Sequence, residues 1–67
     1  AMLDTPTARQ ALEEAITLEN TLLQFHADNA VGFEDESYQK LFRSMMAADK
    51  DHIGTLQTAL DSLAQRE

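Results

Sequence analysis

The sequence predicts an all-α protein: one antiparallel helical hairpin that dimerises into a four-helix bundle. Three observations indicate this class. Only two glycines and one proline interrupt the 67 residues, so strong helix formers continue almost unbroken. Apolar residues recur every three or four positions, which is the period of an amphipathic helix and not of a strand. The chain is also short enough that a single small domain, spanning residues 1–67, is the most that it can form.

The first helix is expected over about residues 6–30. Thr5 precedes Pro6, and this pair is typical of a helix start because Thr can cap the helix and Pro is tolerated in its first turn. Gly32 lies just after the last periodic residue. A glycine at this point favours the end of a helix.

The second helix is expected over about residues 36–64. Glu34, Asp35 and Glu36 come directly before and at its start, where Asp is a preferred capping residue and negative charge interacts favourably with the helix dipole. No further element fits in the chain, and neither an internal repeat nor a low-complexity segment is present. Two amphipathic helices joined by a short loop form an αα-hairpin.

Both helices carry apolar arcs that are wider than one partner helix can cover. A lone hairpin would therefore leave a large apolar surface in water, and pairing two hairpins into a four-helix bundle removes it. We expect a homodimer or a higher homo-oligomer. The arcs contain Ala8, Ala11, Leu12, Ala15, Ile16, Leu18, Leu22, Leu23 and Phe25 in the first helix, and Tyr38, Leu41, Phe42, Met45, Ile53, Leu56, Leu60 and Leu63 in the second.

Composition excludes several classes of function. Twelve Asp and Glu against five Lys and Arg give a formal net charge of −7, which repels nucleic acid and anionic membrane surfaces. No apolar run approaches the length of a membrane span, and no targeting segment is recognisable, so we expect a cytoplasmic protein. Cysteine is absent, so any metal would be held by oxygen and imidazole ligands.

Three polar residues lie inside the apolar stripes: Glu19 in the first helix, and Asp49 and His52 in the second. Counted from the loop at about 1.5 Å per residue, they lie at similar heights in an antiparallel hairpin. A two-fold axis at that level would gather four carboxylates and two imidazoles. That set matches the ligands of a di-iron or di-manganese carboxylate site in a helical bundle.

Two segments carry a family resemblance. The run from Leu41 to His52, LFRSMMAADKDH, resembles the rubrerythrin and ferritin-like signature, in which Leu-Phe-Arg leads into Glu-x-x-His. The run AITLE, ending at Glu19, is similar to the partner helix with its single ligand Glu. The resemblance covers most of the chain and half of the usual four-helix domain. It implies that Glu19, Asp49 and His52 are ligands of dinuclear Fe or Mn, with oxidase, peroxidase or iron-handling activity.

Two positions depart from the family pattern. Asp49 stands where the family has Glu, and its side chain is one methylene shorter, so bridging two metals would require closer helices or a water. His26 stands where the family has Tyr, one heptad from Glu19 and too far to share its metal; it is interpreted as a core or edge histidine. Because the chain has no cysteine, a complete rubrerythrin reaction would need an external reductant.

An alternative interpretation requires no metal. Glu19 would then accept a hydrogen bond from His52 or from the second chain, and the protein would be a helical dimerisation or interaction module derived from the same family. Gly54, in the middle of the second helix, fits either a close crossing by another chain or a neutral surface position. The sequence alone does not decide whether the protein is an enzyme.

Overall fold

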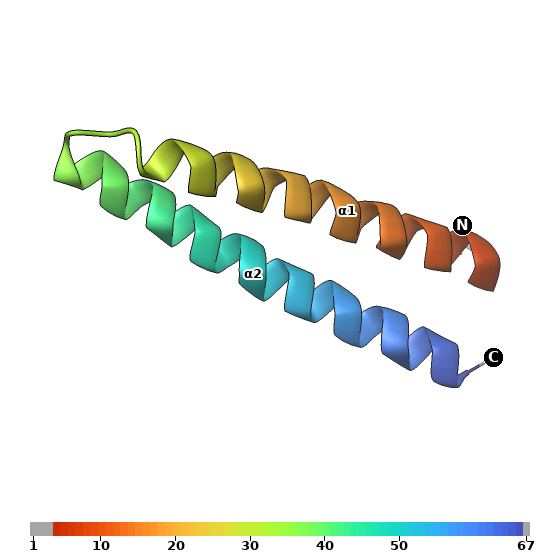
Figure 1. Ribbon diagram of the computed structural model, residues 1–67. Coiled ribbons are helices and arrows are strands. Elements are labelled where there is room, and N and C mark those ends of the chain that lie inside the picture. Colours follow the sequence, from red (N-terminus) through yellow and green to blue (C-terminus); the bar gives the residue numbers. More distant parts are fainter. Residues whose placement is uncertain (1–3, 67) are drawn as a thin grey trace.

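The computed structural model describes residues 4–66, which form two helices, α1 (Thr5–Ala30) and α2 (Glu36–Gln65). The helices run antiparallel and are joined by residues 31–35, so the start of α1 and the end of α2 lie at the same end of the molecule (Figure 1). The predicted all-α hairpin is confirmed. Each helix boundary lies within one residue of its expected position.

The residues at the helix ends agree with the sequence expectations at two ends, and the cap at the start of α1 differs. Asp35 caps α2 as expected, and its side chain accepts a hydrogen bond from the Ser37 N–H at 2.8 Å. At α1 the cap is Asp4 and not Thr5, because the Asp4 carboxylate accepts from the backbone N–H of the first turn at 2.9 Å. Gly32 follows the C-cap residue Val31, which is the position expected for it, but Val31 is right-handed and Gly32 has no positive φ.

The two helices meet along one seam. Seam residues follow one another at alternating intervals of three and four, which is the heptad spacing of paired helices. Every member is buried or half-buried. Within residues 4–66 only Ala30 and Asp49 are buried, and no large side chain is completely enclosed. The seam contains Leu12, Ile16, Glu19, Leu23, His26 and Ala30 of α1, and Phe42, Met46, Asp49, Ile53, Leu56, Leu60 and Leu63 of α2.

The loop end of the hairpin is closed by aromatic packing. Phe33 lies against Tyr38 and Phe42, with ring centroids 5.6 and 4.8 Å apart, and the Gln39 side-chain amide donates to the Phe33 carbonyl. The loop first runs outward, so the first turns of α2 project beyond the end of α1 (Figure 1). This axial offset decides which polar residues of the two helices meet.

Neither α1 nor α2 has a stretch that is long and apolar enough to cross a lipid bilayer.

Candidate functional site

A buried polar pair lies in the seam. His26 Nδ1 and Asp49 Oδ2 are 2.5 Å apart, and the two side chains are only 13% and 8% exposed. The rings of Phe25 and Phe42 meet the imidazole edge-on, with centroids 5.8 and 5.7 Å away. Asp49 therefore has a hydrogen-bond partner in its own chain, inside a largely apolar environment where an unpaired carboxylate would be costly.

A second polar pair lies further along the seam. Glu19 Oε1 is 3.7 Å from His52 Nδ1, which is an ion-pair separation and longer than a hydrogen bond. The other carboxylate oxygen, Oε2, is enclosed and has no hydrogen-bond partner among the residues that the structure describes. Such an oxygen destabilises a protein by about 1–3 kcal/mol. The Glu19 carboxylate is thus only half satisfied within one chain.

The structure brings together two of the three residues that the sequence singled out. Glu19 and His52 are neighbours, whereas Asp49 bonds to His26. Counting residues from the loop assumed that both helices start at the same height, and the projecting first turns of α2 shift Asp49 toward His26. In residues 4–66 no group of three His, Cys, Asp or Glu side chains is placed to hold a metal ion.

His26 and His52 occupy environments different from the expected ones. His26 is in the core, which is one of the two places predicted for it, but its bond to Asp49 was missed. The available signal was that both residues fall on the seam stripes of their helices. His52 was expected to point inward, yet its side chain is 60% exposed. It lies at the edge of the seam, where a second chain can reach it.

Beside the seam runs a second apolar stripe on each helix, here called the apolar face. Its residues also recur at intervals of three and four, and in an antiparallel pair equivalent flanking positions meet on the same side. All five large apolar helix residues that remain highly exposed belong to it: Leu18, Leu22, Phe25, Tyr38 and Leu41. The complete face is Ala8, Ala11, Ala15, Leu18, Leu22 and Phe25 of α1, and Tyr38, Leu41, Met45, Ala48, His52, Thr55 and Ala59 of α2.

The opposite flank of the seam is polar. Glu13 and Asn20 of α1 and Arg43, Lys50 and Gln57 of α2 occupy it, and all five are exposed. The hairpin therefore presents one apolar face and one hydrophilic face. This is the pattern of a layer that is covered on one side only.

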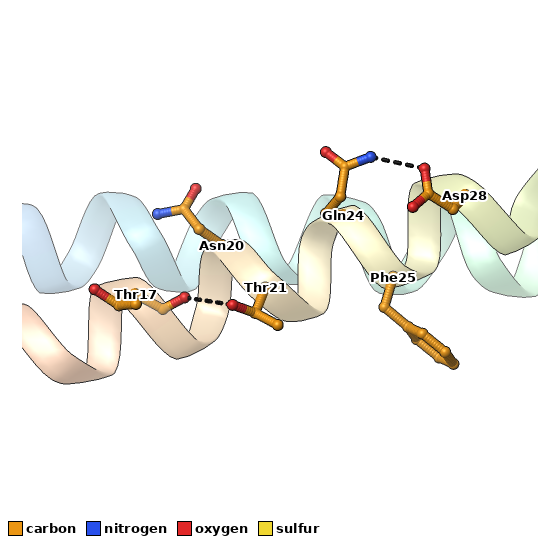
Figure 2. Close-up of a pocket in the computed structure, with 6 residues that line it drawn as sticks. All are labelled: Thr17, Asn20, Thr21, Gln24, Phe25 and Asp28. Atoms are coloured by element: carbon orange, nitrogen blue, oxygen red, sulfur yellow. Dashed lines mark hydrogen bonds between the residues drawn. The ribbon is translucent and has the colours of Figure 1, made fainter.

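A shallow hollow on the outer side of α1 is lined by Thr17, Asn20, Thr21, Gln24, Phe25 and Asp28 (Figure 2). All six residues come from one helix. The Thr21 hydroxyl donates to the Thr17 carbonyl at 3.1 Å, and the Gln24 amide donates to the Asp28 carboxylate at 2.7 Å. Because these polar groups are already paired along the helix, the hollow does not offer a set of converging groups for a ligand.

Comparison with models of protein families, with curated proteins and with solved structures finds no match. The functional argument therefore depends on the residues of this chain. They define a helical hairpin with one uncovered apolar face and, at the middle of that face, a histidine beside a half-satisfied carboxylate.

Proposed function

We propose that two copies of this chain associate through the apolar face and that the resulting four-helix bundle binds Fe or Mn through Glu19 and His52 of both copies, in a ferritin-like or rubrerythrin-like manner. One observation carries the proposal. Glu19 Oε2 is enclosed and has no hydrogen-bond partner within residues 4–66, while Oε1 lies 3.7 Å from the His52 imidazole. A cation at this point would satisfy the carboxylate and use the imidazole as a second ligand.

The donor set fits such a metal. Carboxylate oxygen and imidazole nitrogen are suitable ligands for Fe and Mn, and two chains would supply two of each. Asp49 would become a third ligand from each chain only if it released His26. In the observed arrangement Asp49 holds His26 instead, and both stay next to the site as seam residues.

A bound metal pair would supply the capacity to activate oxygen or peroxide. The chain's own residues would hold the metal and exclude water from it, because the apolar face on both sides of His52 becomes covered on association. Oxidase, peroxidase and iron-handling activities all fit this arrangement, with an external reductant where the reaction requires one.

The test is metal uptake by protein purified without chelator, measured by elemental analysis after anaerobic titration with Fe(II) or Mn(II). We expect about two metals per dimer, as in dinuclear carboxylate bundles. His52→Ala should abolish uptake. His26→Gln is the matched control, since it alters the other histidine and should leave the stoichiometry unchanged. No uptake by the wild-type protein, or equal loss in both variants, would reject the proposal.

The second candidate is a metal-free dimerisation or interaction module. It is favoured by the engagement of Asp49 with His26 and by the lack of a three-ligand group in the described part of one chain. In this case the dimer would be equally stable with chelator and with Mn(II), and its mass in solution would not depend on either. A metal-dependent increase in dimer stability separates the first candidate from the second.

A further inference from the structure

We infer that the apolar face is covered by a second copy of this chain in an antiparallel arrangement, with the loop end of one copy against the open end of the other. The two-fold axis would cross the face at the level of Glu19 and His52. This inference depends on the self-association in the proposed function but not on metal binding. Four observations, on area, charge, side-chain size and the position of Glu19, support it.

The exposed area of a single chain is too large for a compact monomer. The hairpin exposes 5049 Å², whereas a compact protein of 7.5 kDa is expected to expose about 4,250 Å². The excess is about 800 Å², which is the area that each partner buries in a protein interface of standard size. One additional layer of helices on one side of the hairpin accounts for it.

The charge pattern favours a second copy as the occupant. None of the thirteen residues of the apolar face is Asp, Glu, Lys or Arg, although the chain has twelve acidic and five basic residues. A chain with a net charge of −7 repels its own copy, and an uncharged contact area adds no like-charge pairs to that repulsion. This face is the part of the described surface that meets that condition on both helices.

The apolar face is asymmetric in side-chain size along its length. The half nearest the loop carries five large residues and one small one: Leu22 and Phe25 of α1, and Tyr38, Leu41, Met45 and the small Ala48 of α2. The half nearest the open end carries only small ones: Ala8, Ala11 and Ala15 of α1, and Thr55 and Ala59 of α2. Glu19 and His52 lie where the two halves meet, with Leu18 beside them.

Only one orientation of two copies matches these halves. When the copies are antiparallel, the large half of each lies on the small half of the other, and the interface is filled evenly along its length. When they are parallel, large residues meet large residues at one end and alanines face alanines at the other. That arrangement is overpacked at one end and leaves a cavity at the other, and both are unfavourable.

The same axis also gives a reason for the unsatisfied carboxylate. Because Glu19 and His52 lie at the midpoint of the face, antiparallel docking brings both copies of the pair to the axis. Each enclosed Glu19 Oε2 then gains neighbours from the second chain. A second copy matches both the size pattern and this position, so it is the occupant to which we assign the face.

The orientation can be measured directly because the chain has no native cysteine. A nitroxide spin label on Glu34→Cys, at the exposed loop, reports the distance between the loops of two copies by double electron–electron resonance in the presence of chelator. We expect about 48 Å, twice the rise between the start of α2 and His52. Parallel copies would give at most about 25 Å, the width of two helix layers. Lys50→Cys, on the polar flank near the middle, is the control, because its distance is similar in both orientations.

A size exchange tests the complementarity. Met45→Ala and Ala59→Met, seven residues before and after His52 on α2, should each weaken the dimer about tenfold or more. The double variant keeps the same apolar composition and should recover most of the wild-type affinity, because α2 packs against α2 of the second copy in the antiparallel dimer and the two sites then face each other. Purely additive effects would overturn the inference.

The outcomes separate the two proposals. A dimer with loop-to-loop distances below about 25 Å overturns the antiparallel arrangement and leaves the metal-binding proposal standing. A monomeric mass at all micromolar concentrations overturns both. A long loop-to-loop distance in a dimer that takes up no metal supports this inference and rejects metal binding.

Discussion

Replacing Glu19 with Leu should stabilise the metal-free dimer and abolish metal uptake. Glu19 occupies a seam position whose neighbours along α1 are Ile16 and Leu23, so a leucine fits the local heptad pattern. The substitution removes the enclosed Oε2, which has no partner in the described residues. It also removes one of the two ligands that each chain is proposed to supply.

The magnitude follows from two opposing contributions. Removing an unsatisfied buried oxygen gains about 1–3 kcal/mol. Losing the attraction between Glu19 and His52 has a small effect, because the pair is 3.7 Å apart and His52 is 60% exposed; exposed pairs contribute about 0–1 kcal/mol. The net expectation is an increase of about 1–2 kcal/mol in the free energy of unfolding per chain.

The assay is equilibrium unfolding in urea at fixed protein concentration, with chelator and separately with Mn(II). Protein concentration must be held constant because folding and association are coupled in a dimer of small chains. Glu13→Leu is the matched control: it makes the same chemical change at an exposed position on the polar flank and should change stability by less than about 0.5 kcal/mol. Mn(II) should stabilise the wild type and not Glu19→Leu.

One result would refute the reasoning. If Glu19→Leu lowers the stability of the chelated protein while Glu13→Leu does not, Glu19 Oε2 is satisfied in the assembled protein by a hydrogen-bond donor. The carboxylate would then be a structural residue. If Mn(II) also fails to stabilise the wild type, the metal-free module becomes the better description.

Three further predictions test the hairpin itself. Gly54→Ala should stabilise the protein by about 1 kcal/mol, because an added Cβ would meet no described atom within 4 Å. A loss of dimer affinity in this variant would instead indicate that another chain packs against α2 at Gly54. Replacing either His26 or Asp49 alone with Leu should destabilise by about 1–3 kcal/mol, since one buried polar group is left unpaired, whereas the double Leu variant should be nearly neutral in urea unfolding. Hydrogen bonds from the first turn of α1 lower the pKa of the Asp4 carboxyl below its ordinary value of 3.8. The cap therefore stabilises α1 fully above that pH, and this stabilisation is lost as the pH falls through the lowered pKa. NMR titration of the wild type and of an Asp4→Asn variant should show pH-dependent fraying of α1 only in the wild type.

The sequence was sufficient for the elements of the fold. Helix-forming composition, one proline near the start and the cap at Asp35 give the two helices and their bounds, because these signals act within a few residues along the chain. The width of the apolar arcs also indicated that one hairpin leaves apolar surface uncovered, which the exposed Leu18, Phe25 and Leu41 now show. The N-cap of α1 differs from the one expected: Asp4 and not Thr5 caps the helix, because adjacent polar residues compete for the same backbone N–H groups.

Only the tertiary structure decided which polar side chains meet. Glu19 and Asp49 lie on the inward stripes where the sequence placed them, whereas His52 was expected to point inward and is 60% exposed. The heights of all three residues were counted from the helix ends. The loop runs outward before α2 begins, so α2 is shifted along the axis relative to α1, and Phe33 packs against Phe42 of α2 in this arrangement. The shift pairs Asp49 with His26 and leaves Glu19 with His52. Helical periodicity fixes the direction of a side chain around its own axis, whereas the relative height of two helices depends on the packing of the loop between them.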